Sequence, residues 1–140
     1  MRRKLRAAGG KNFDLYHLCY YLSKNTSRDK DQQLILDFKN NDEQAVRQFI
    51  IAAIDHLQHL GIDEDTLIIR ALGSRETKAD PNISKGLQRL GTSLSWVFDC
   101  DHFPSIIYKK RPTTTVKHLG IAEWRAELEG VYGWIKILLI

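Results

Sequence analysis

One amphipathic stretch, residues 41–60, constrains the fold more than any other part of the sequence. Its apolar residues recur at helical spacing and so share one helix face: Val46, Phe49, Ile50, Ala53, Leu57 and Leu60. Asn41 can cap the helix, and Gln44 stands three residues later, as in a capping box. Gly61 follows the last apolar residue and favours a helix end. The pattern predicts a long helix with one face on a core.

The segments before this helix are shorter. Residues 13–24 (FDLYHLCYYLSK) have leucines at helical spacing with aromatic residues between them, and periodicity alone leaves helix and strand both open. Residues 27–41 predict a short helix that ends at two asparagines, with Leu34, Ile35 and Phe38 facing inward.

After the long helix, apolar runs alternate with helical patterns. Residues 65–72 (DTLIIRAL) and 104–110 (PSIIYKK) are typical of strands, and the first has the composition of a strand buried on both faces. A second amphipathic helix, capped by Asn82, is predicted between them, with these residues inward: Ile83, Leu87, Leu90 and Leu94.

The chain ends with the same alternation. Residues 120–130 predict a short helix, with Ile121, Trp124 and Leu128 on its inner side, and residues 135–140 (IKILLI) predict a final strand. Helices that alternate with short apolar strands are typical of βαβ units. We therefore expect an α/β fold with a mainly parallel sheet flanked by helices.

The composition suits one domain. The chain has 140 residues, 43% of them hydrophobic, and a net charge of +4. Part of that charge lies in the first six residues, so residues 1–12 are predicted to be a basic flexible tail and residues 13–140 a single domain of nearly neutral charge.

The apolar runs and the cysteines predict the cellular compartment of the protein. No apolar run follows the basic start, as a secretory signal would need, and no stretch approaches the roughly 20 apolar residues of a membrane helix. Cys19 and Cys100 are interpreted as reduced thiols. We expect a cytoplasmic protein that does not contact a membrane.

The loop after the first predicted strand is a candidate binding site. In open parallel sheets, ligands bind at the carboxyl ends of the strands. Arg70 and Arg75 can bind anions, Gly73 permits close backbone approach, and Ser74 and Thr77 carry hydroxyl donors. Phosphate or pyrophosphate suits this set. A solvated connection in which Arg75 pairs with Glu76 is the alternative.

A second candidate follows the strand at residues 104–110. Lys109, Lys110 and Arg111 are successive cations, and Thr113 and Thr115 add hydroxyl groups. Such a cluster can neutralise phosphate oxygens, although a charge run at a strand end is often simply solvated. If both strands belong to one parallel sheet, the two loops lie side by side.

Other chemistry has weaker support. His56 and His59 lie one helical turn apart without a recognisable third ligand, and Cys100 with His102 needs a second pair, such as His17 and Cys19, to hold zinc. No metal site is predicted from these residues. No nucleophile elbow is present. The tryptophans lie among apolar residues and are expected in the core: Trp96, Trp124 and Trp134.

With these segments identified, the chain resembles the ComF-type phosphoribosyltransferase family. Residues 34–50 look like its early helix block, residues 66–95 (TLIIRALGSRETKADPNISKGLQRLGTSLS) resemble its first core strand, pyrophosphate loop and helix, and residues 107–132 look like its Arg-x-Thr-x-Thr segment. The matching positions in the last segment are Arg111, Thr113, Thr115, Leu119 and Arg125. Val116 and Gly120 depart from the family pattern, and its N-terminal zinc module is missing.

The resemblance implies transfer of a phosphoribosyl group from phosphoribosyl diphosphate, with Mg²⁺, to a nitrogen nucleophile. It assigns Arg70, Gly73, Ser74, Arg75 and Thr77 to the substrate. It gives the catalytic role of stabilising the leaving diphosphate to these residues: Lys109, Lys110, Arg111 and Thr113.

The resemblance also gives a meaning to the last strand. In the family, such a strand leads into acidic residues and a loop that holds the 5-phosphate, whereas this sequence stops at Ile140. We therefore expect an incomplete domain that is inactive alone and self-associates through its C-terminal strand. The alternative function is a nonenzymatic nucleic-acid or partner-binding module that uses the basic tail and the Lys109–Arg111 cluster.

Overall fold

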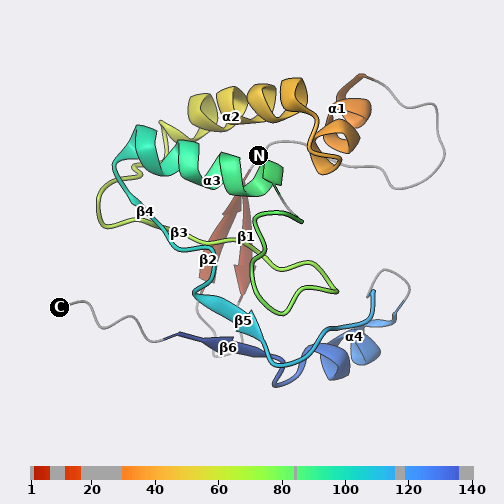
Figure 1. Ribbon diagram of the computed structural model, residues 1–140. Helices are drawn as coiled ribbons and strands as arrows, with labels where there is room; N and C mark the ends of the chain where they lie inside the picture. Colours follow the sequence, from red (N-terminus) through yellow and green to blue (C-terminus); the bar gives the residue numbers. More distant parts are fainter. Residues whose placement is uncertain (1, 7–11, 17–29, 84, 116–118, 136–140) are drawn as a thin grey trace.

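The computed structural model describes residues 2–6, 12–16, 30–83, 85–115 and 119–135 (Figure 1). The described helices are α1 Lys30–Lys39, α2 Glu43–Leu57, α3 Lys85–Phe98 and α4 Ile121–Leu128. The described strands are β1 Arg2–Arg6, β2 Asn12–Tyr16, β3 Leu67–Ile68, β4 Asp101–His102, β5 Ile107–Lys109 and β6 Tyr132–Trp134. The chain is thus a mixed α/β protein.

The helices α1, α2 and α3 form one layer, in which α2 and α3 run side by side (Figure 1). Glu43 near the start of α2 pairs with Arg89 on α3. The rings of Phe38 and Phe49 pack with centroids 4.5 Å apart. Small and aliphatic side chains make up the buried centre of this layer: Ile35, Ala45, Val46, Ala53 and Leu94. The predicted long helix and its partner helix are confirmed.

The start of α2 differs from the prediction by one residue. Asp42, not Asn41, is the N-cap, and its Oδ1 accepts a hydrogen bond from the Ala45 N–H at 2.9 Å. Asn41 has φ of +62°, which reverses the chain between α1 and α2. Its Oδ1 accepts a hydrogen bond from the Gly86 N–H at 2.8 Å. The residue predicted to cap α2 therefore provides an acceptor for a backbone N–H near the start of α3 instead.

The buried face of α3 is formed largely by glycine. Gly86 lies against Val46, and Gly91 lies against His102 of β4. Leu94 is buried as predicted, whereas Ile83 and Leu87 are 62% and 40% exposed, so their predicted inward positions are wrong. The physical reason is that close helix approach needs small residues, which an apolar pattern does not count. The helix also begins at Lys85, after the predicted cap Asn82.

The strands pair in three two-stranded sheets within the described residues. β3 and β4 are parallel and joined through α3, which makes one βαβ unit, but its second strand is Asp101–His102 and not the predicted strand at residues 104–110. The pairs β1–β2 and β5–β6 are antiparallel. The expectation of a mainly parallel sheet is therefore wrong, because α4, which connects β5 to β6, does not lie over a sheet as a crossover helix would.

Two predicted burial patterns also fail. Only Leu67 and Ile68 of the run 65–72 form a strand, and Leu67 and Ile69 are each 43% exposed, so this strand is not buried on both faces. In α4, Ile121 and Trp124, which were predicted to face inward, are 76% and 44% exposed. A short helix with no buried residue gains little from packing, and it is held by polar contacts described below.

The ends of the chain are partly described. Arg2–Arg6 forms β1, paired antiparallel with β2, within the segment predicted to be a basic flexible tail. The predicted final strand 135–140 lies outside the described residues except for Ile135, whose N–H continues the antiparallel ladder by donating to the Ile106 carbonyl at 2.9 Å. None of the described helices is long and apolar enough to cross a membrane.

The contact between α3 and β4 gives a stability prediction. A Cβ at Gly91 would lie 2.6 Å from His102 Cε1. Gly91→Ala should therefore destabilise the protein, because overpacking of about 1–3 kcal/mol exceeds the helix-propensity gain of about 1 kcal/mol. With His102→Ala in place, the same substitution should stabilise by up to about 1 kcal/mol. Urea unfolding of the four variants measures both values, and an equal effect in both backgrounds would contradict the contact.

Candidate anion-binding loops

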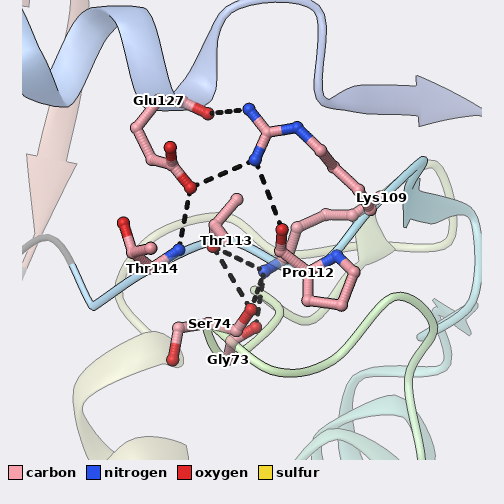
Figure 2. A network of polar contacts seen from close by, with 8 residues as sticks. Gly73, Ser74, Lys109, Pro112, Thr113, Thr114 and Glu127 are labelled. Atoms are coloured by element: carbon pink, nitrogen blue, oxygen red, sulfur yellow. Dashed lines mark hydrogen bonds and ion pairs between the residues drawn. The ribbon is translucent and has the colours of Figure 1, made fainter.

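The structure brings the two predicted loops together. We call residues 69–80 the first loop and residues 109–115 the second loop. The Lys109 N–H donates to the Thr77 carbonyl at 2.8 Å, and the Thr113 N–H donates to the Ser74 carbonyl at 2.8 Å. Lys109 and Thr113 thus fix the second loop against the first at two points of the backbone (Figure 2).

The Lys109 ammonium group joins the loops through its side chain (Figure 2). Nζ donates to the Gly73 carbonyl at 2.6 Å, to the Ser74 carbonyl at 3.0 Å and to Thr113 Oγ1 at 3.1 Å. An ammonium group has three donors, and these contacts use all three. The residue is only 3% exposed. Burial lowers the pKa of Lys109, and the nearby Glu76 carboxylate opposes that shift.

This geometry changes the role predicted for Lys109. A catalytic lysine that stabilises a leaving diphosphate must point its ammonium at the ligand, but this ammonium points into the protein and is saturated by the first loop and Thr113. Thr113 is similarly engaged, since its Oγ1 accepts from Lys109 and donates to the Ser74 carbonyl at 3.3 Å. Both residues hold the loops in place.

Arg70 and Glu76 form a buried ion pair within the first loop. Arg70 Nη1 and Nη2 donate to the two carboxylate oxygens at 2.9 and 2.6 Å, and both side chains are at most 6% exposed. The Gly73 N–H donates to Glu76 Oε2 at 2.7 Å. Glu76 is therefore paired with Arg70, not with Arg75 as the alternative had it. Arg70 and Gly73, predicted to bind substrate, are bound to this carboxylate.

The same contacts explain the acidity of Glu76. The hydrogen bond from Arg70 is the main cause that lowers its pKa from 4.5 to about 2, with a smaller contribution from the Gly73 N–H, while burial acts in the opposite direction. The carboxylate is ionised at neutral pH, so its charge and that of Arg70 cancel inside the loop.

Arg111 forms hydrogen bonds with Glu127 of α4. Its Nη1 donates to Glu127 Oε1 at 3.1 Å and its Nη2 to the Glu127 carbonyl at 3.0 Å. The Thr114 N–H donates to the same Oε1 at 2.8 Å. Hydrogen bonds from Thr114 and then Arg111 lower the pKa of Glu127. Arg111 remains half exposed, so its guanidinium can still be reached from solvent.

Four of the predicted site residues keep side chains that are open to a ligand. Arg75 and Lys110 are exposed, Ser74 and Thr77 are half-buried, and none of these side chains has a polar partner within the described part of the chain. Arg75 follows Ser74, and Lys110 follows Lys109, so both cations stand next to the residues that join the loops. Thr115 is exposed beyond them.

Sequence reasoning missed the two glutamates that organise the site. Glu76 was considered only as a partner of Arg75, and Glu127 was not considered. Glu76 lies within the loop it orders, at a spacing from Arg70 that a local search could find. Glu127 lies sixteen residues after Arg111 on another element, and no local pattern connects them.

The other candidate chemistries find no support in the described residues. These contain no group of three His, Cys, Asp or Glu side chains arranged to hold a metal ion. His17 and Cys19 lie outside the described residues. The prediction that the tryptophans are in the core is wrong, since Trp96, Trp124 and Trp134 are 85%, 44% and 70% exposed. Each lies at a surface that the described elements leave uncovered.

Comparison with known proteins identifies no relative. No family model, no curated protein and no solved structure matches this chain.

Substitution of Lys109 tests its place in the loops. Lys109→Met should lower the free energy of unfolding by about 2–3 kcal/mol, because it leaves buried acceptors without donors. Lys110→Met, at the exposed neighbour, should change it by less than about 0.5 kcal/mol. Urea unfolding followed by circular dichroism measures both. Equal effects of the two substitutions would contradict the position of Lys109.

The ion pair in the first loop makes stability depend on pH. Because the pKa of Glu76 falls from 4.5 to about 2 on folding, its contribution is present above pH 4.5 and is lost as the pH falls toward 2. This shift corresponds to about 3 kcal/mol. The variant Arg70→Met with Glu76→Leu should lose a pH-dependent component of about that size, measured by urea unfolding between pH 2 and 5. An unchanged pH dependence in this variant would show that the pair is not formed.

Proposed function

We propose that this chain binds phosphate-bearing anions at the face formed by the first and second loops. The observation that carries the proposal is the junction made by Lys109, because it places two loops that each carry an exposed cation next to each other. Arg75 and Lys110 supply the charge, and Ser74 and Thr77 supply hydroxyl donors that suit phosphate oxygens.

The charge balance of this face favours an anion. The nearby carboxylates of Glu76 and Glu127 are each paired with an arginine, so they do not offset Arg75 and Lys110. Binding of a diphosphate could also draw Arg111 away from Glu127, since that ion pair is half exposed and such pairs contribute little stability.

The resemblance to ComF-type phosphoribosyltransferases supports a finer proposal, which is that the anion is phosphoribosyl diphosphate. In that reaction, the bond from ribose C1 to a diphosphate oxygen breaks, a bond from C1 to the nitrogen nucleophile forms, and the nitrogen loses a proton. Ser74, Arg75 and Thr77 would contact the diphosphate, and Lys110 and Arg111 would stabilise it as it leaves. Lys109, Thr113, Arg70 and Gly73 would hold these groups in position.

Mg²⁺, which the resemblance implies, does not fit the described residues well as a protein-bound ion. The two carboxylates that contact the loops, Glu76 and Glu127, are both occupied by arginine.

The proposal is tested by calorimetric titration with inorganic diphosphate and with phosphoribosyl diphosphate plus Mg²⁺. We expect binding that Arg75→Ala and Lys110→Ala each weaken by about tenfold or more, as for charge-assisted hydrogen bonds. Arg47→Ala, at an exposed arginine on α2, is the matched control and should leave affinity unchanged. Absence of binding to both ligands would overturn the proposal.

Titration with an oligonucleotide as a third ligand separates the finer proposal from the nucleic-acid alternative. Tighter binding of phosphoribosyl diphosphate than of diphosphate would favour the transferase class. Tighter binding of an oligonucleotide, with an affinity that falls steeply as salt rises, would instead favour polyanion recognition by β1 and the second loop. The burial of Lys109 argues against the latter, because it leaves Lys110 and Arg111 as the accessible cations of the predicted cluster.

A further inference from the structure

One edge of the strand β6 pairs with no other strand among the described residues. Lys110 donates to the Val131 carbonyl, and Ile135 donates to the Ile106 carbonyl. In an antiparallel ladder, hydrogen-bonded pairs recur at every second residue, so Gly133 also directs its N–H and C=O toward β5. The backbone groups of Tyr132 and Trp134 therefore point away from β5, toward the open edge of β6.

The opposite edge of this sheet is already covered. On β5, the Lys109 N–H points away from β6 and donates to the Thr77 carbonyl of the first loop. No third strand pairs with either member of this sheet in the described part of the chain. An isolated two-stranded ribbon is at best marginally stable in water, and β6 is the side on which it can grow.

The side chains of β6 are those of an interface. Tyr132 and Trp134 lie on one face of the sheet and are 44% and 70% exposed. Gly133 lies on the other face, where a Cβ would sit 2.6 Å from Tyr108 Oη, so the Tyr108 ring packs directly over the glycine. Ile135, next along the chain, is 51% exposed. Residues 131–135 carry no charged side chain, so two such strands can approach without placing like charges opposite each other.

We propose that β6 is the interface of a symmetric dimer, in which it pairs antiparallel with β6 of a second copy of this chain. The register follows from the open backbone groups. Tyr132 of each copy faces Trp134 of the other, the two pairs exchange four hydrogen bonds, and Gly133 faces Gly133 at the twofold axis. Two ribbons become one four-stranded sheet.

This register is self-complementary in its side chains as well. Directly opposite residues on one face interact, so each Tyr132 ring lies beside a Trp134 ring of the second copy. Each aromatic side chain buries about 150–250 Å² when it is fully covered, so four partly exposed rings contribute several hundred Å². This is below the roughly 1,200 Å² of a standard interface, and the dimer is therefore weak, with a dissociation constant in the micromolar range or above.

Sedimentation velocity over a concentration series tests the dimer. The wild-type chain should pass from monomer to dimer, with no larger species, because the twofold pairing uses up both open edges. Trp134→Glu should weaken the dimer at least tenfold. Trp96→Glu, at the more exposed tryptophan on α3, is the matched control and should leave it unchanged. A wild-type monomer at several hundred micromolar, open-ended association, or loss of the dimer on Trp96→Glu would overturn the proposal.

A mixing experiment tests the register. Tyr132→Lys and Trp134→Glu should each weaken self-association, since each replaces two aromatic pairs. Their equimolar mixture should recover a heterodimer, because one aromatic pair is retained and the introduced lysine of one variant faces the introduced glutamate of the other. Circular dichroism confirms that each variant is folded. Failure of the mixture to associate better than either variant alone would exclude this register, and with it the proposed pairing.

Discussion

The arrangement of the candidate site depends on one buried ammonium group. Lys109 reaches from β5 into the first loop and meets two backbone carbonyls and a hydroxyl, while its own N–H binds a third carbonyl of that loop. Carbonyl oxygens that point inward would be costly to bury without donors. The Lys109 side chain therefore supplies hydrogen-bond donors that the backbone of a neighbouring strand would otherwise provide. It fixes the first loop to β5, although the first loop does not form a strand of that sheet.

The first loop contains both a buried ion pair and an exposed arginine. Arg70 and Glu76 neutralise each other below the surface, and their hydrogen bonds order the turn around Gly73. A buried pair of this kind adds little net stability, but it favours one loop conformation over others. Arg75 is thereby left on an ordered turn. An exposed arginine on a fixed backbone loses less conformational freedom when an anion binds than one on a mobile loop.

The sequence was a good guide where periodicity is strong and a poor one where a few long-range contacts decide. The helix around Val46 was identified because apolar residues repeat along fifteen residues. The meeting of the two loops was also expected, from the rule that ligands bind beyond strand ends, although the strands proved short and of mixed direction. The roles of Lys109 and Arg70 could not be foreseen, since a lysine or arginine looks the same in sequence whether it faces solvent or a buried acceptor. The exposed face of α4 was misjudged because Trp124 and Ile121 have the spacing of a core helix, but none of the described elements covers them.

The attachment of α4 has a consequence for the loops. This helix buries no residue, and its link to the second loop runs through Glu127, which receives Arg111 and the Thr114 N–H. Partial unwinding of so lightly anchored a helix should occur far more readily than global unfolding. Each such fluctuation would release a guanidinium beside Lys110 and make the electrostatic potential there more positive. The extent of such unwinding would therefore determine how much of the positive charge of Arg111 is left unpaired beside the second loop.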